Sequence, residues 1–200
     1  MQVQDIAEFN SKYFNYMIAS EEAEDASGWD YDTWLDDVYD DKDIDTILQA
    51  TCDGFVATCG NDSDQTLSYL DLSKMDDYFT KFEAMASVIK ATAKSNSSTF
   101  NSIINSVKSF GDGWWSSGLD DYGTIDGLDF LNKLGSNAKF TSFQTQINEA
   151  KEAYGKLVKY SKIGTGAGRA NGLVIIAALS YSVSYPESET SFTNWRSLFK

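Results

Sequence analysis

Residues 14–35, FNYMIASEEAEDASGWDYDTWL, contain the transition that decides the fold. Residues 16–20 (YMIAS) predict a short buried strand, and a helical stripe of apolar side chains runs directly into it from the N-terminal side. An acidic loop with one glycine follows the strand and leads to a helix expected at residues 31–39. A helix that runs straight into a buried strand is typical of α/β proteins, so we expect an α/β fold.

The rest of the chain continues this pattern of helices separated by short strands. Helices are expected at residues 44–58, 75–94, 100–110, 126–134 and 140–160, strands at 66–72 and 172–179, and a closing helical turn at 191–200. Ser73 is the expected N-cap of the helix at 75–94, and the glycine-rich residues 111–127 predict an irregular segment. No linker is long enough to separate domains, so residues 1–200 are expected to form a single domain.

Charge and composition exclude several functions. The 16 basic and 30 acidic side chains give a formal net charge of −14, and the first 80 residues hold 20 of the acidic and 3 of the basic ones. A nucleic-acid partner needs a dense basic footprint, which is missing, whereas cationic side chains and metal ions suit such a field. The sequence contains no histidine, so neither a histidine-dependent catalytic triad nor a histidine metal site can be built from it alone.

The two cysteines, Cys52 and Cys59, are expected on one face of the same helix. At about 1.5 Å of rise per residue they would lie roughly 10 Å apart, too far for a disulfide, so buried thiols are expected.

No membrane span is expected, because the longest apolar run, residues 173–179, is far shorter than a bilayer requires. Residues 1–14 carry charges among their apolar positions and do not have the pattern of a signal peptide.

The aspartates at positions 41, 43 and 45 have the spacing of the first calcium ligands in an EF-hand loop. Thr46 replaces the required glycine, and Cys52 replaces the final glutamate, which excludes an EF-hand. Two alternatives remain, a solvated acidic helix start and an irregular calcium site.

The acidic loop after the first strand is the main candidate site. Glu21, Glu22, Glu24 and Asp25 lie just past a strand end, where open α/β sheets place ligand sites, and Trp29 follows. A carboxylate beside an indole can bind an arginine or lysine, because the carboxylate pairs with the head group and the ring covers the aliphatic stem. The alternative is a solvated acidic loop with Trp29 packed as an anchor.

Three stretches resemble the clostripain-like cysteine peptidases, relatives of gingipain and the caspases that cut after arginine or lysine. Residues 14–35 resemble the segment that follows the catalytic cysteine of that family. The stretch TLSYLDLSKMDDYFTKFEAMASVIK is similar to a later helix entry, and RANGLVIIAAL with FTNWRSLF is similar to the family's C-terminal strand and closing segment.

The resemblance implies a partial caspase-like three-layer sandwich with few strands, many helices and an incomplete sheet that exposes an edge strand. It also implies that Ser20, Glu21, Glu22, Asp25 and Trp29 line a specificity pocket for arginine or lysine in peptide or protein substrates. Members of this family are often secreted or attached to the cell surface.

In that family the nucleophilic cysteine ends a strand just before the helix that here begins at Gln2, and the partner histidine lies on an earlier strand. Neither residue is present, and Cys52 and Cys59 do not match the nucleophile's position. We therefore expect the C-terminal portion of such an endopeptidase, inactive alone and complemented by an N-terminal chain that carries histidine and cysteine. The alternative function is a non-catalytic acidic module that binds basic peptides or calcium.

Overall fold

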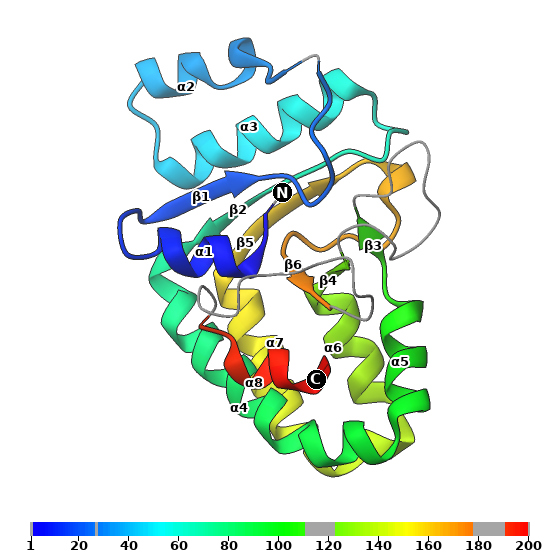
Figure 1. Cartoon of the computed structure of the whole chain (residues 1–200). Coiled ribbons are helices and arrows are strands. Elements are labelled where there is room, and N and C mark those ends of the chain that lie inside the picture. The colour runs from blue at the N-terminus through cyan, green and yellow to red at the C-terminus, as the bar shows by residue number, and fades with distance from the viewer. Residues whose placement is uncertain (1, 27, 111–122, 178–190, 200) are drawn as a thin grey trace.

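The computed structural model describes residues 2–26, 28–110, 123–177 and 191–199 (Figure 1). Its α-helices are α1 (Gln4–Asn10), α2 (Leu35–Tyr39), α3 (Ile44–Cys59), α4 (Met75–Ser95), α5 (Ser97–Ser106), α6 (Gly127–Ser136), α7 (Gln144–Leu157) and α8 (Thr193–Arg196). The strands are β1 (Tyr16–Ala19), β2 (Thr66–Asp71), β3 (Ser109–Phe110), β4 (Thr124–Asp126), β5 (Val158–Ile163) and β6 (Val174–Ile176). Short 3-10 helices are η1 (Tyr31–Thr33), η2 (Leu72–Lys74), η3 (Ala138–Phe143), η4 (Thr165–Ala167) and η5 (Ser197–Phe199).

The strands form two small antiparallel sheets, one in the order β1-β2-β5 and the other in the order β3-β4-β6. The segment before α1 connects them. Gln2 N donates to Ser20 O at 2.7 Å, Val174 N donates to Gln2 O at 2.9 Å, and Val3 forms a parallel bridge with Val174. The end of β1, the start of β6 and the first described residues therefore meet at one place.

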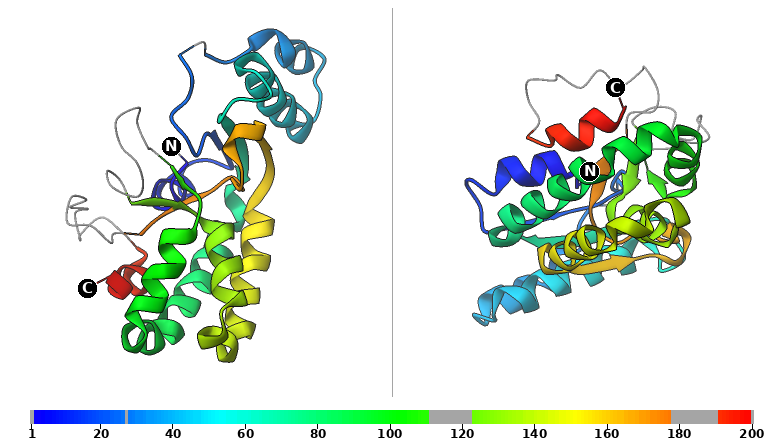
Figure 2. Two further views of the ribbon diagram at one scale, coloured as in Figure 1. Left: turned by 90° about the vertical axis from the view of Figure 1, so that its right-hand side faces the viewer. Right: turned by 90° about the horizontal axis from the view of Figure 1, so that it is seen from below.

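The sheets lie between two groups of helices. Helix α3 covers one side of the β1-β2-β5 sheet, with α2 beyond it, and α4, α5, α6 and α7 lie on the other side (Figures 1 and 2). Cys52, Phe55 and Val56 of α3 pack with Leu67 and Tyr69 of β2 on the first side. The larger core cluster joins α4, α6 and α7 to β2, β4 and β6 on the second. This mixed α/β arrangement, with few strands and many helices, confirms the expected fold class.

The C-terminal segment, residues 191–199, packs against α4 and is hydrogen-bonded to it. Trp195 is 1% exposed and packs edge-on against Phe82 and Phe130. The Glu83 carboxylate accepts hydrogen bonds from Asn194 N at 2.7 Å and Trp195 N at 2.9 Å, which satisfies amides at the start of α8. The helical turn expected near the C-terminus is thereby confirmed.

The predicted strands at 16–20 and 66–72 are confirmed as β1 and β2, and the helix at 44–58 as α3, but β1 is half-buried with Tyr16 exposed, not buried as expected. The single helix predicted at 140–160 is wrong. It is divided into η3, α7 and β5, because the alternating residues 158–163 (VKYSKI) pair with β2, and this pairing overrides their helical propensity.

The helix predicted at 31–39 is divided into η1 and α2. Two further helices also differ from expectation. Ser73 does not cap α4; Asp71 instead caps η2 by accepting from Ser73 N. The helix predicted at 100–110 begins at Ser97 and ends at Ser106. The irregular segment expected at 111–127 lies outside the described residues up to 122, and only part of the strand predicted at 172–179 is described, as β6.

Candidate functional site

The acidic loop leaves β1 beside Gln2 and passes toward α2 and α3 (Figure 1). Of the five residues predicted to line a pocket, Ser20 and Glu21 are fully buried, Glu22 and Trp29 are half-buried, and Asp25 is exposed. The structure therefore separates the loop into an inner part, which bonds to the rest of the chain, and an outer part, which faces solvent.

Ser20 anchors the loop to β2. Its hydroxyl lies 3.0 Å from the hydroxyl of Thr66 and accepts a hydrogen bond from Glu22 N at 3.1 Å. Thr66 also accepts from Glu21 N at 2.9 Å. These contacts attach the first turn of the loop to β2, so Ser20 supports the candidate site without facing a ligand.

Glu21 points into the protein. Its Oε2 accepts a hydrogen bond from Gly172 N at 2.7 Å, and Asp126 accepts from the adjacent Asn171 N at 2.6 Å, which places the two carboxyl groups side by side. Burial, and next the nearby Asp126, hold the pKa of Glu21 well above its ordinary value. A carboxyl group in this position favours the protonated form and cannot serve as an exposed anion for a substrate.

The outer part of the loop combines a carboxylate with an aromatic ring. The indole Nε1 of Trp29 donates to Glu24 Oε2 at 2.9 Å, and the ring packs partly against the cluster under α3. Asp25 N donates to Gln65 Oε1 at 3.0 Å, which fixes the backbone beside the exposed Asp25 side chain. Trp29 is thus both an anchor, as one alternative predicted, and a neighbour of a carboxylate, as the other did.

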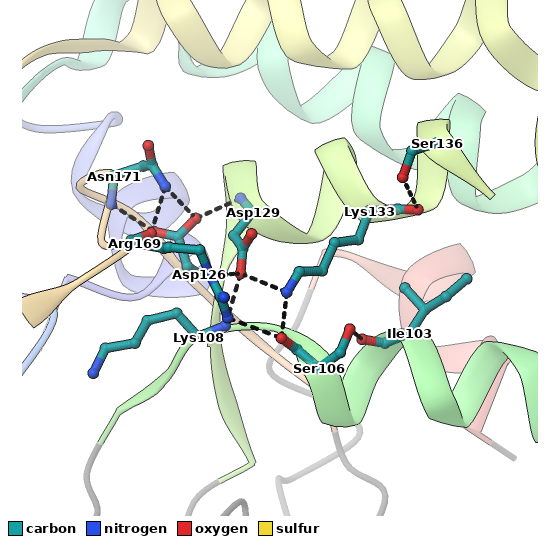
Figure 3. Close-up of polar contacts among 9 residues, drawn as sticks. All are labelled: Ile103, Ser106, Lys108, Asp126, Asp129, Lys133, Ser136, Arg169 and Asn171. Atoms are coloured by element: carbon teal, nitrogen blue, oxygen red, sulfur yellow. Dashed lines mark hydrogen bonds and ion pairs between the residues drawn. The ribbon is translucent and has the colours of Figure 1, made fainter.

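A second cluster of polar side chains lies around the first turns of α6 (Figure 3). Asp126 caps this helix by accepting from Asp129 N at 2.6 Å, and it also accepts from Asn171 N at 2.6 Å and Asn171 Nδ2 at 3.0 Å. Asp129 Oδ2 forms ion pairs with Lys133 at 3.3 Å and Arg169 at 3.1 Å. The sequence does not reveal this cluster, because Arg169 and Asn171 reach Asp129 and Asp126 across 40 and 45 residues with no local spacing signal.

A groove of about 670 Å³ lies between α5 and α6. It is lined mainly by hydroxyl and amide side chains from those helices: Ser98, Thr99, Ser102, Ile103, Ser106, Lys133, Ser136 and Asn137. None of the five predicted pocket residues lines it.

As predicted, no disulfide joins Cys52 and Cys59, but only Cys52 is buried as expected, and Cys59 is half-buried. Cys52 is fully buried, and burial raises the pKa of its thiol further above the ordinary range. A thiol that resists ionisation is a poor nucleophile, because the thiolate is the reactive form.

Two of the three aspartates proposed for an irregular calcium site, Asp43 and Asp45, have other partners. Asp43 caps α3 by accepting from Thr46 N at 3.0 Å and from its hydroxyl at 2.7 Å, which lowers the pKa of Asp43. Asp45 pairs with Lys159 at 3.6 Å. Within the described ranges no group of three or more histidine, cysteine, aspartate or glutamate side chains could hold a metal ion, and no helix could span a membrane.

Comparison with known proteins gives a consistent result. The sequence model of the clostripain family matches residues 1–200. A clostripain from Bacteroides thetaiotaomicron, solved with the peptide inhibitor BTN-VLTK-AOMK, is 15% identical with a TM-score of 0.66, over 98% of this chain and 82% of that one. An inactive zymogen C11 protease from Parabacteroides distasonis is 14% identical with a TM-score of 0.71, over 100% of this chain and 56% of that one.

A secreted C11 cysteine protease from Bacteroides thetaiotaomicron is 15% identical with a TM-score of 0.68, over 99% of this chain and 52% of that one. This chain therefore spans little more than half the length of the last two relatives. At these identities the structural comparisons establish a shared fold. No curated protein sequence matches the chain.

Proposed function

Because this chain belongs to the clostripain family of cysteine peptidases, we propose that it forms the substrate-binding portion of an endopeptidase that cleaves after arginine or lysine. Glu22, Glu24, Asp25 and Trp29 form the wall that receives the basic side chain, while the buried Ser20 and Glu21 attach the loop to β2 and to Gly172. We call residues 22–29 the outer loop.

The observation that carries the proposal is the hydrogen bond between Trp29 Nε1 and Glu24 Oε2, at 2.9 Å. It holds a carboxylate at the edge of an indole, on a loop that also presents Glu22 and Asp25. Carboxylates attract an ammonium or guanidinium head group, and an aromatic face covers the aliphatic stem of the same side chain. The peptide letters of the inhibitor in the related clostripain structure, VLTK, end in lysine, which supports the same preference.

The proposed reaction is thiol-catalysed peptide hydrolysis. A thiolate attacks the carbonyl carbon of the scissile bond, the amine leaves with a proton, and water then hydrolyses the acyl-enzyme. The 200 residues contain no histidine base, and the buried Cys52 is a poor nucleophile. We therefore propose that cysteine and histidine are supplied by an N-terminal chain, and that this chain alone is inactive.

The test is reconstitution. The chain is mixed with a polypeptide that carries the family's histidine and cysteine, and hydrolysis is measured on matched amides that end in lysine, arginine or glutamine. We expect cleavage of the two basic substrates, little cleavage of the glutamine substrate, and none without the second polypeptide. A stable complex that hydrolyses none of these amides contradicts the proposal.

Charge-removing variants test the outer loop. Asp25→Asn and Glu22→Gln are each expected to lower kcat/KM for the lysine substrate about fivefold, because a partly exposed ion pair contributes up to about 1 kcal/mol. Glu152→Gln on the exposed side of α7 removes the same charge elsewhere and should leave kcat/KM unchanged. Equal effects of all three variants would point to net charge rather than to the loop.

A second candidate function is a binding module for basic peptides that acts without catalysis. It is favoured by α2, where exposed Leu35, Val38 and Tyr39 stand among exposed aspartates. Calorimetry on the chain alone, with arginine peptides and separately with calcium, tests this function. The absence of heat at millimolar ligand rejects it.

A further inference from the structure

Both backbone polar groups of Gly172, its N–H and its carbonyl, are hydrogen-bonded by side chains distant in sequence. Glu21 Oε2 accepts from Gly172 N at 2.7 Å, 151 residues away along the chain. On the other side Gly172 O accepts from Gln2 Nε2 at 2.5 Å and from Ser68 Oγ at 2.8 Å. The start of the acidic loop, the segment before α1 and strand β2 are thus all attached to the backbone of one residue, Gly172.

The backbone groups of the neighbouring residues, Asn171 and Leu173, are also hydrogen-bonded to side chains. Asn171 N donates to Asp126 Oδ2 at 2.6 Å, and Tyr154 donates to Asn171 O and accepts from Leu173 N, both at 3.0 Å. Several hydrogen bonds therefore fix the backbone position of residues 171–173. Glu21 connects the acidic loop to this backbone segment.

The contact between Glu21 and Asp126 requires a proton. Two carboxylates cannot hydrogen-bond to each other unless one is protonated, and Asp126 already accepts from the Asp129 and Asn171 amides. Glu21 Oε1 has no donor within reach in the described part of the chain, so it is the oxygen able to carry the proton toward Asp126.

We propose that Glu21 is a positioning residue for the substrate wall, which acts as a protonated carboxyl group that donates to Asp126 while accepting from Gly172 N. The inference rests on the proposed function, since the outer loop is what Glu21 positions. Loss of the shared proton leaves two carboxylates together in a dry interior, and their repulsion detaches the loop from residues 171–173.

Other charged or titratable groups face this pair from the surrounding helices. Burial raises the pKa of Tyr78 on α4 and of Tyr154 on α7 well above their ordinary value, so both remain neutral. Asp5 of α1 acts on Tyr78, and Asp129 of α6 is already paired with Lys133 and Arg169. Among the groups named here, the change of charge with pH therefore comes from the proton that Glu21 and Asp126 share.

The decisive variant is Glu21→Gln. A glutamine amide donates toward Asp126 and its carbonyl accepts from Gly172 N, which reproduces the protonated glutamate with no titration. Glu21→Ala removes both contacts, and Glu149→Gln on the surface of α7 is the control for charge. Hydrogen exchange of the Gly172 and Glu22 amides, corrected for intrinsic rates, is measured from pH 5 to pH 9 on the chain alone, together with its circular dichroism.

In the wild type and in Glu149→Gln, protection of both amides is expected to fall by up to tenfold per pH unit once the pair loses its proton. In Glu21→Gln protection should stay constant, and in Glu21→Ala it should be lost at every pH while the circular dichroism remains native. In the reconstituted enzyme, Glu21→Ala should raise KM for the lysine substrate more than it lowers kcat.

Identical pH profiles in the wild type and Glu21→Gln would overturn the proposal. So would unchanged protection in Glu21→Ala. Both outcomes are read on the isolated chain, so they are distinct from a failure of reconstitution, which would count against the proposed function instead.

Discussion

At the scale of single residues, the structure separates side chains that the sequence groups together. Ser20, Glu21 and Glu22 are consecutive and polar, yet the first two are buried and the third is half-buried. The sequence predicts the place of the loop, because a strand end is a local feature. It does not predict that Glu21 points inward, because the partners that stabilise this orientation, Gly172 and Asp126, are more than 100 residues away and have no spacing relation to it.

The two cysteines should differ in reactivity. Cys52 is fully buried with a raised thiol pKa, whereas Cys59, at the end of α3, is partly exposed. We expect iodoacetamide at pH 8 to label Cys59 at least tenfold faster than Cys52 in the folded chain, because alkylation requires an accessible thiolate. Peptide mass mapping over time measures both rates. Equal rates in the folded chain, matching those in denaturant, would show that α3 does not protect Cys52.

At the scale of elements, strand β5 shows where local pattern fails. Residues 144–157 carry a clear helical stripe and form α7, and nothing in the next six residues breaks a helix. Their alternation of apolar and polar side chains is compatible with a strand, and pairing with β2 decides the outcome. By contrast α3 was predictable, because its helical stripe of apolar residues agrees with the face that it buries against β2.

The turn that enters β6 makes a prediction at this scale. Gly172 has φ of +107°, and a Cβ there would lie 2.9 Å from Val158 Cγ1 and 3.0 Å from Ser68 Oγ. Gly172→Ala is therefore expected to destabilise the chain by about 2 kcal/mol, from backbone strain and this crowding. Denaturant unfolding measures the change. Gly155→Ala on α7, where a Cβ meets nothing within 4 Å, should be neutral or stabilising. A neutral Gly172→Ala would mean that this turn can rearrange at no cost.

At the scale of the whole molecule, buried acids make stability depend on pH in an unusual direction. Burial raises the pKa of Glu21, Asp126 and Glu83 above their ordinary values. A carboxyl group whose folded pKa is raised contributes stability that is complete below its unfolded pKa and is lost as pH rises through the folded pKa. We therefore expect the free energy of unfolding to fall as pH rises above the ordinary carboxyl pKa of about 4, opposite to the usual effect of paired surface carboxylates.

The excess of acidic side chains, which gives a net charge of −14, also lowers the free energy of unfolding as pH rises, because the carboxylates repel one another more as they ionise. Salt distinguishes the two causes, because screening weakens repulsion between exposed charges and acts little on buried ones. Urea unfolding from pH 5 to pH 8 should keep most of its slope in 0.5 M NaCl. Glu21→Gln should reduce that slope at either salt concentration, because glutamine does not titrate. A slope that disappears in salt, with Glu21→Gln identical to wild type, would assign the whole effect to the surface.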